Sequence, residues 1–206
     1  MSQDRRRHWD EVYALKPADK LSWFQSEPAR SLALIDSSGV GPEDPIVDIG
    51  GGASLLVDRL LDRGFRRLTV IDIAESGLAV AQARLGPRQA QVAWLVQDVT
   101  SWQPRAASLA LWHDRAVFHF LVAEKDRQGY VRALDRGLEP GGFAIFGTFA
   151  LTGPERCSGL PVQRYSAETL RAVLGPAYRL LDHQIERHVT PAGGSQDFLW
   201  CLFGKG

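Results

Sequence analysis

The chain has 206 residues, of which 45% are hydrophobic and 23% are charged. This composition is typical of a folded globular protein and excludes an intrinsically disordered chain. At roughly 150 residues per domain, the length predicts one compact domain. The 24 lysines and arginines balance the 24 aspartates and glutamates, so the net charge indicates neither a nucleic-acid partner nor an anionic membrane surface.

Cysteine content and hydropathy give two further expectations. The two cysteines, Cys157 and Cys201, are far apart in the sequence, so we expect neither a disulfide framework nor a metal site. The first residues contain no apolar run typical of a secretory signal, and no stretch approaches the ~20 apolar residues of a membrane span. We therefore expect a cytoplasmic protein without membrane contact. Its oligomeric state is not indicated.

Helical and strand patterns alternate along most of the chain. The first part predicts helices over 8–14 and 29–35, and strand patterns follow at 46–49, 68–71, 92–96, 109–112 and 143–149. Helical patterns between these strands cover 55–63, 75–85 and 124–138. The last part adds a short helix at 167–174 and two strand patterns, 178–187 and 198–203. The loop between these two strands is too short for a crossover helix, so we expect them to pair antiparallel.

This order of elements predicts a doubly wound α/β fold with a mostly parallel sheet, since its strands are apolar throughout and alternate with helices. We expect a single domain with three parts. Residues 1–44 form a helical cap, residues 45–150 form a ligand-binding core, and residues 151–206 add a loop and the antiparallel strands.

The turn after the first strand is the most informative motif. It reads Asp48-Ile49-Gly50-Gly51-Gly52-Ala53-Ser54, and its glycines let the backbone turn sharply and approach a ligand. Asp72 ends the second strand 22 residues after Gly50, close to the ~20-residue spacing at which an acid meets ribose hydroxyls. The structural alternatives are a turn without a ligand and a helix cap at Asp72. Together, the turn and the acid predict a nucleoside-containing ligand.

Two residues favour a sulfonium ligand over a dinucleotide. Leu55 stands where the dinucleotide motif Gly-x-Gly-x-x-Gly has its third glycine. Asp48 would repel a pyrophosphate but suits a ligand with an ammonium group and a sulfonium centre. S-adenosylmethionine (SAM) is such a ligand.

These motifs resemble those of class I SAM-dependent methyltransferases. The matching residues are Asp48-x-Gly50-x-Gly52-x-Ser54, Asp72, Asp98 and Leu138-Glu139-Pro140-Gly141-Gly142. The resemblance covers residues 8–206 and implies a Rossmann-like sheet of seven strands with the last one antiparallel. Ser54 departs from the family, which more often has glycine there.

The resemblance also implies a set of cofactor-binding residues. It places Asp48 and Gly50 near the methionine part, Asp72 on the ribose hydroxyls and Ile73 against the adenine. Asp98 and the amide of Val99 are expected at the adenine ring, with a turn cap as the alternative for Asp98. The expected set is completed by Gly51, Gly52, Ser54, His113 and Arg115.

The helical cap is similar to that of small-molecule members such as thiopurine and related thiol methyltransferases. Its motifs are His8-Trp9-Asp10-Glu11-Val12-Tyr13 and Ser22-Trp23-Phe24-Gln25. The resemblance implies that Trp9, Tyr13 and Trp23 fold over the cofactor and that Phe24 lies near the substrate. The alternative is that these rings only anchor the cap to the core.

The segment after the fourth strand carries the candidate catalytic residues. His119 has the pKa range of a general base, and Asp114 could orient His113 or pair with Arg115. A core histidine and a solvated ion pair are the structural alternatives. Arg156 and Cys157, in the loop after the fifth strand, are expected near the substrate.

The resulting hypothesis is an enzyme that transfers a methyl group from SAM to a small-molecule acceptor such as a thiol or a carboxylate, with S-adenosylhomocysteine as the other product. The first alternative is a protein lysine methyltransferase. More distant alternatives are a non-catalytic SAM-binding protein and an NAD(P)-dependent oxidoreductase.

Overall fold

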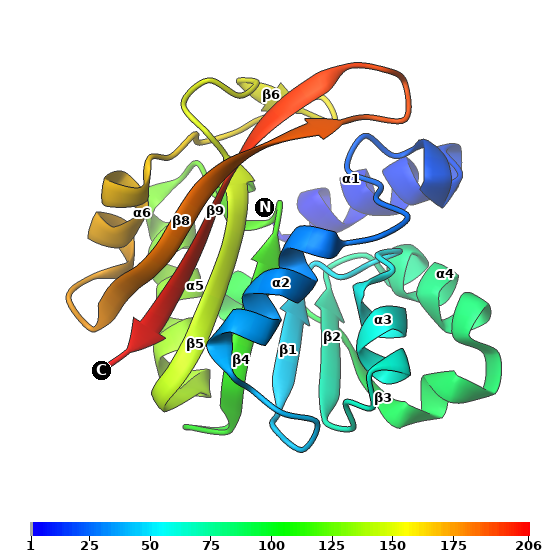
Figure 1. Ribbon diagram of the computed structural model, residues 1–206. Coiled ribbons are helices and arrows are strands. Elements are labelled where there is room, and N and C mark those ends of the chain that lie inside the picture. Colours follow the sequence, from blue (N-terminus) through cyan, green and yellow to red (C-terminus); the bar gives the residue numbers. More distant parts are fainter. Residues whose placement is uncertain (1) are drawn as a thin grey trace.

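A central sheet with helices on both faces forms the protein, as the computed structural model of residues 2–206 shows (Figure 1). The strand order is β3-β2-β1-β4-β5-β9-β8. The strands are β1 (Ile46–Ile49), β2 (Leu68–Asp72), β3 (Val92–Val96), β4 (Leu109–Arg115), β5 (Leu138–Phe149), β8 (Tyr178–Val189) and β9 (Ser195–Lys205). Pairs among β1 to β5 are parallel, whereas β9 is antiparallel to both β5 and β8. The predicted seven-stranded fold with an antiparallel last strand is confirmed.

The helices divide between the two faces of the sheet. They are α1 (Ser2–Leu15), α2 (Ala29–Ser38), α3 (Leu56–Asp62), α4 (Glu75–Leu85), α5 (Glu124–Gly137) and α6 (Ala167–Leu174). One apolar cluster joins one face of the sheet to α2, α3 and α4, and a second joins the other face to α5 and α6. Because both faces are covered, all four residues of β1 are buried, which explains its apolar sequence.

Shorter elements complete the chain. Four 3₁₀ turns are η1 (Ala18–Lys20), η2 (Gly86–Gln91), η3 (Val99–Ser101) and η4 (Phe118–Phe120). A small hairpin of β6 (Arg156–Cys157) and β7 (Leu160–Pro161), which the sequence did not predict, follows β5.

The strand β4 is longer than predicted and ends at Arg115 instead of Trp112. Its polar end stays in the sheet because His113 lies opposite Asp48 of β1 and Ile145 of β5 in the parallel register. The extension matters for function, since it carries polar side chains to the carboxyl end of the central strands.

The helix α1 lies across the carboxyl ends of the parallel strands (Figure 1). Arg6 Nε donates to the carbonyl of Ile73 at 3.1 Å, and Asp10 Oδ1 accepts from Ser76 N at 3.2 Å. These bonds attach the cap to the segment that follows β2.

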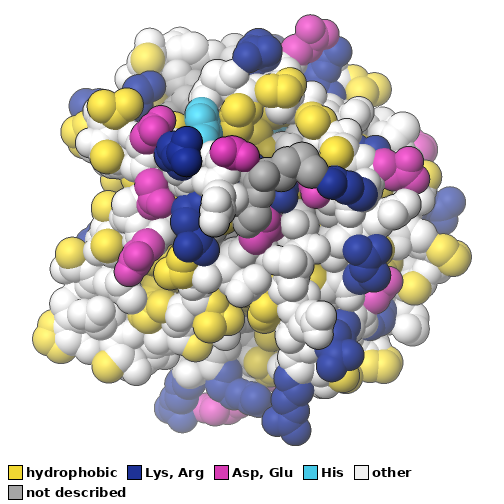
Figure 2. Space-filling view, turned by 180° about the vertical axis from the view of Figure 1, so that it is seen from behind, with side chains coloured by type: hydrophobic (Ala, Val, Ile, Leu, Met, Phe, Trp, Pro, Cys, Tyr) yellow, Lys and Arg dark blue, Asp and Glu magenta, His cyan; other side chains and the backbone are white. Residues whose placement is uncertain are grey.

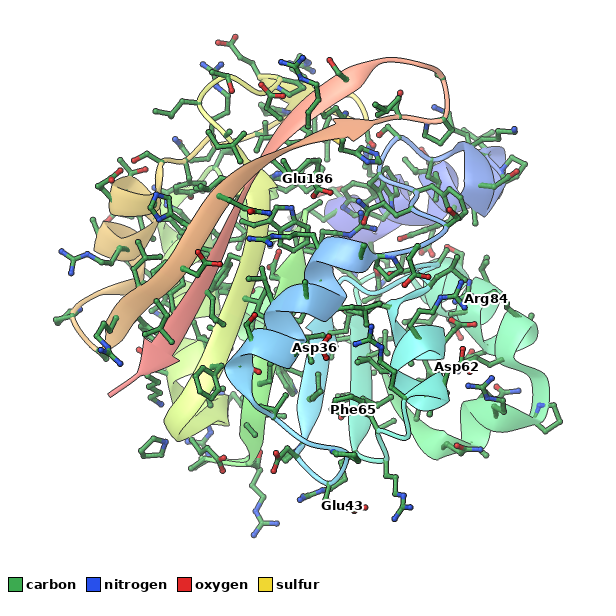
Figure 3. The ribbon with its side chains drawn as sticks, in the orientation of Figure 1. Asp36, Glu43, Asp62, Phe65, Arg84 and Glu186 are labelled. Carbon is green, nitrogen blue, oxygen red and sulfur yellow. The ribbon has the colours of Figure 1, made fainter. Side chains whose placement is uncertain are left out.

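The start of α3 is attached to α4 by Arg84, which lies on α4 beside α3 (Figure 3). Arg84 Nη2 pairs with Asp58 Oδ2 at 2.6 Å, and Nη1 donates to the carbonyl of Ala53 at 3.0 Å. Arg84 therefore fixes the residues that directly follow the glycine turn between β1 and α3.

The surface carries charges of both signs. Figure 2 shows that basic side chains gather along the lower edge of the back face, which is formed by the amino ends of the parallel strands. This basic edge therefore lies opposite the carboxyl ends of the strands. In residues 2–206, no helix is both long enough and apolar enough to cross a bilayer.

Candidate functional site

A cavity lies at the carboxyl ends of β1 to β4, beneath α1. Most of the predicted cofactor-binding residues line it, namely Trp9, Tyr13, Trp23, Asp48, Gly50, Gly51, Ser54, Asp72, Ile73, Asp98, Val99, His113 and Arg115. Gly52 is not part of its wall, because the Tyr13 hydroxyl lies against that glycine. Open parallel sheets bind ligands at this edge, so the fold brings the predicted residues together where a ligand is expected.

The glycine turn needs its glycines for conformation and for packing. Gly50 and Gly52 have φ values of +64° and +40°, in the left-handed region that side chains other than glycine rarely adopt. A Cβ at Gly50 would lie 2.0 Å from Val117 Cγ2, and a Cβ at Gly52 would lie 2.1 Å from the Tyr13 hydroxyl. Glycine is therefore required at both positions by conformation and by the packing of Val117 and Tyr13, and Gly50 also lines the cavity.

Asp72 presents one carboxylate oxygen to the protein and leaves the other without a donor. Its side chain is 6% exposed, and Oδ1 accepts from Ala74 N at 2.8 Å, just before α4. No described side chain donates to Oδ2, which lies 2.9 Å from where a Gly52 Cβ would be. Burial raises the pKa of Asp72 to about 7, and the charge of Asp48 adds to this effect. One oxygen has the predicted structural role, and the other is available to a ligand.

Asp48 is paired with His113 behind the glycine turn. Asp48 Oδ1 lies 2.7 Å from His113 Nδ1, and His113 Nε2 lies 2.9 Å from Ser31 Oγ. Ser31 is on α2 and was not predicted, because nothing in the sequence of that helix indicates a polar partner for β4.

Asp98 is engaged by the protein on both oxygens. Oδ1 accepts from Thr100 N at 3.0 Å and from Thr100 Oγ1 at 2.7 Å, which caps η3. Oδ2 pairs with Arg5 Nη2 of α1 at 3.0 Å. The turn-cap alternative for Asp98 therefore describes this structure. Arg5 was not predicted, since it belongs to a basic run that resembles an exposed surface.

The cap and η4 provide an aromatic wall near the end of β4. The ring of Trp9 meets that of Phe120 edge to face, with centroids 4.9 Å apart, and that of Trp23 at 5.8 Å. Cys157 of β6 also lines the cavity, and burial raises the pKa of its thiol. Phe120 was not predicted. The Trp9–Phe120 and Trp9–Trp23 contacts also anchor α1, as the structural alternative proposed.

Arg115 reaches from the end of β4 toward the cap. Its Nη1 donates to the carbonyl of Trp23 at 2.8 Å and to Gln25 Oε1 at 3.0 Å. Its Nε and Nη2 find no acceptor in the part of the chain that the structure describes. Burial lowers the pKa of Arg115, whereas the charges of Asp48 and of Glu186, which lies on β8 (Figure 3), act in the opposite direction. Arginine stays charged under such conditions, so the cavity wall contains a cation with two free donors.

The structure corrects the prediction of a general base at His119. The side chain is fully buried among the rings of Phe120, Phe149 and Phe198, and it does not line the cavity. Nδ1 accepts from Phe149 N at 3.2 Å, so the ring proton is on Nε2. Burial lowers the pKa of His119 to about 3. It is a core histidine.

The predicted catalytic role of Asp114 also does not fit its surroundings. Asp114 is fully buried, with Oδ1 accepting from Val117 N at 3.0 Å. Its Oδ2 accepts from Phe118 N at 3.1 Å and from the Tyr130 hydroxyl at 2.6 Å. Its carboxylate therefore anchors the turn after β4 and is not available to a substrate.

Two predicted substrate residues lie outside the cavity wall. Phe24 lines a separate shallow surface depression with Gln25 and His188. Arg156 is exposed and donates to the carbonyl of Gly159 within its own hairpin. Of the predicted substrate residues, Cys157 alone lines the cavity.

Comparison with known proteins gives a family match for the core. Residues 46–142 match a family model described as a methyltransferase domain. An eEF1A lysine and N-terminal methyltransferase of Danio rerio is 24% identical over 119 residues, which are 58% of this chain and 17% of that protein. A malonyl-[acyl-carrier protein] O-methyltransferase 2 of Ilyobacter polytropus is 25% identical over 189 residues, covering 84% of this chain and 71% of that protein. The chain thus spans less than a fifth of the first relative.

A solved structure shows the same fold. The N-methyltransferase NodS of Bradyrhizobium japonicum, in complex with S-adenosylhomocysteine, has a TM-score of 0.72 and 19% identity. The match covers 95% of this chain and 97% of that one. The names of these three proteins specify nitrogen or oxygen acceptors, so similarity alone does not indicate which acceptor this chain uses.

Proposed function

We propose that this chain, which belongs to the class I SAM-dependent methyltransferases, methylates a small molecule whose nucleophile is already ionised near neutral pH, such as an aromatic thiol or a carboxylate. SAM is the methyl donor and S-adenosylhomocysteine is the other product. When bound, SAM supplies an electrophilic methyl group on a sulfonium.

The polar atoms of the cavity suit the donor. Asp72 Oδ2 would accept from the ribose hydroxyls, and charge-assisted hydrogen bonds of this kind are among the stronger ones. Asp48 would attract the ammonium group of the methionine part, and the free Nε and Nη2 of Arg115 would hold its carboxylate. The carboxylate of Asp48 on β1 and the guanidinium of Arg115 on the neighbouring strand β4 are thus complementary to the ammonium and carboxylate groups of an amino acid.

The aromatic wall of Trp9, Trp23 and Phe120 is the observation that carries the acceptor proposal. It offers a flat apolar molecule good contact and excludes water, and none of its three rings can remove a proton. Asp114 and His119 are buried in the core. Of the ionisable groups that line the cavity, Asp48 and Asp72 are assigned above to the donor, whereas Asp98 and His113 are bonded to other residues. The acceptor must therefore lose its proton before it binds.

These residues act by positioning. Holding an acceptor in line with the methyl group can contribute as much as ~7–11 kcal/mol to lowering the barrier. Thiolates and carboxylates are nucleophilic without further deprotonation, so positioning is sufficient for them. The raised pKa of Cys157 keeps that thiol neutral, which prevents it from competing as a nucleophile.

A lysine side chain is the second candidate acceptor, because one relative is named as a lysine methyltransferase. A lysine ammonium must lose a proton before transfer, and a nearby carboxylate would normally receive it. Here the charge bonded to the backbone of the aromatic wall is the guanidinium of Arg115, which donates to the carbonyl of Trp23 and repels an ammonium group.

The test measures S-adenosylhomocysteine release with matched acceptors. An aromatic thiol is compared with the aromatic amine that has the same ring system, and an aromatic carboxylate is compared with the corresponding amide. Lysine peptides are assayed beside these four compounds. We expect turnover of the thiol or the carboxylate and none of the amine or the amide. Trp9→Ala should raise the KM of the acceptor about tenfold with little change in kcat, as the loss of a ring contact predicts. Turnover of lysine peptides alone would overturn the proposal.

A further inference from the structure

Three buried polar side chains form a hydrogen-bonded chain behind the cavity. His113 of β4 bonds Asp48 of β1 through Nδ1 at 2.7 Å and Ser31 of α2 through Nε2 at 2.9 Å. The order of groups is that of a hydrolase triad, but Ser31 is only 1% exposed and does not line the cavity. Its hydroxyl cannot reach a substrate, so the chain must have another role.

The hydrogen bonds determine where the protons lie. In the part of the chain that the structure describes, Ser31 Oγ has His113 as its only partner. A buried hydroxyl donates wherever an acceptor is available, so Ser31 donates to Nε2. The ring proton is then on Nδ1 and is donated to Asp48 Oδ1.

The same bonds direct the Asp48 carboxylate. Oδ1 is held by His113, whose ring packs against Trp200 with centroids 6.3 Å apart. Oδ2 lies along the glycine turn, 2.7 Å from where a Gly51 Cβ would be, and no residue from 2 to 206 donates to it. One oxygen is thus fixed, and the other remains free at the cavity wall.

We propose that Ser31 is a positioning residue for the methyl donor. By donating to Nε2 it holds the orientation of the His113 ring, whose Nδ1 bonds Asp48 Oδ1, and His113 in turn orients Asp48 toward the α-ammonium group of the donor. This inference rests on the proposed function in taking SAM as the donor. Without the Ser31 hydroxyl, the buried Nε2 loses its partner, and the ring that bonds Asp48 Oδ1 is no longer held in place.

The experiment uses Ser31→Ala with Ser31→Thr as the matched control, because threonine retains the hydroxyl. Calorimetry measures the binding of S-adenosylhomocysteine and of 5′-methylthioadenosine, which has the nucleoside but no amino-acid part. We expect Ser31→Ala to weaken the binding of S-adenosylhomocysteine about tenfold, the size of effect expected when a buried group loses its hydrogen-bond partner. Binding of 5′-methylthioadenosine should not change, and Ser31→Thr should bind both ligands as the wild type does.

A second measurement, on the unliganded wild type, needs no variant to fold. Nitrogen-15 NMR of the imidazoles should show His113 as the Nδ1–H form, whereas an Nε2–H form or an imidazolium would refute the proton placement. Equal weakening of both ligands in Ser31→Ala would indicate a merely structural role and overturn the inference, as would unchanged binding of both. If the wild type binds neither ligand, the proposed function fails, while the NMR result still decides the proton placement.

Discussion

The Asp72→Asn substitution should separate stability from donor binding. Burial raises the pKa of this carboxyl group from 3.8 to about 7. Between these values the unfolded chain is ionised while the folded protein keeps the proton, so stability falls as the pH rises from about 4 to 7. One pKa unit corresponds to 1.36 kcal/mol, so from pH 7 upward the ionised carboxylate costs the fold up to about 4 kcal/mol.

Asparagine is neutral at every pH and keeps an oxygen for the amide of Ala74, whose bond to Asp72 is 2.8 Å long. At pH 8 we therefore expect Asp72→Asn to be more stable than the wild type by as much as about 4 kcal/mol without ligand, with the difference vanishing near pH 4. For a chain of this size, Tm rises by roughly 2–4 °C for each kcal/mol. The same change removes a charged acceptor for the ribose, worth about 1.5–3 kcal/mol, or roughly ten- to over a hundredfold in Kd.

The assay combines thermal denaturation of the ligand-free protein at pH 5 and pH 8 with calorimetry of S-adenosylhomocysteine. Asp98→Asn is the matched control, because Asp98 is also buried in the cavity wall but has Arg5 within 3.0 Å. That change removes the closer of the two carboxylates that pair with Arg5, the other being Asp126 at 3.6 Å, and should lower Tm. A Tm gain in Asp72→Asn that does not depend on pH, or a loss of Tm at pH 8, would refute the reasoning.

Two further substitutions test the reassigned core residues. The pKa of His119 is lowered to about 3, so the wild type should lose about 2 kcal/mol between neutral pH and pH 5, where the unfolded histidine is protonated and the folded one is not. His119→Gln should remove this acid sensitivity in urea denaturation and still transfer methyl groups. Asp114→Ala deprives the Tyr130 hydroxyl and two backbone amides of their acceptor and should cost at least about 2 kcal/mol. A thousandfold loss of kcat in folded, equally stable Asp114→Ala would restore a catalytic role for Asp114.

The fold was largely predictable because its signal is local. The apolar stretch of β1 lies where both faces of the sheet are covered. The elements α4 and β3 begin and end where the periodicity predicts, although β3 is an edge strand with mostly exposed residues. The end of β4 was not predictable in this way. His113 and Asp114 remain in the strand because buried partners on other elements satisfy them, and hydropathy contains no information about such partners.

The candidate site was predictable where residues are adjacent to strand ends and not where side chains meet across the fold. The glycine turn and Asp72 lie in the cavity because the carboxyl edge of a parallel sheet is a known binding edge. Ser31 and Arg5 meet their partners across 82 and 93 residues of sequence, so packing alone brings them there. His119 was misassigned because its neighbours in sequence do not reveal that its ring points into the core.

The acids of the cavity also predict how protons move when the donor binds. The ligand-free protein holds Asp72 largely protonated at pH 6, because its pKa is about 7. Ribose hydroxyls donating to Oδ2 would favour the ionised form and lower this pKa, so donor binding should release up to about one proton near pH 6. Calorimetry in two buffers of different ionisation enthalpy measures this number directly. Asp72→Asn should release none from this position, and a wild type that releases no proton, or takes one up, would show that Asp72 does not accept from the ribose.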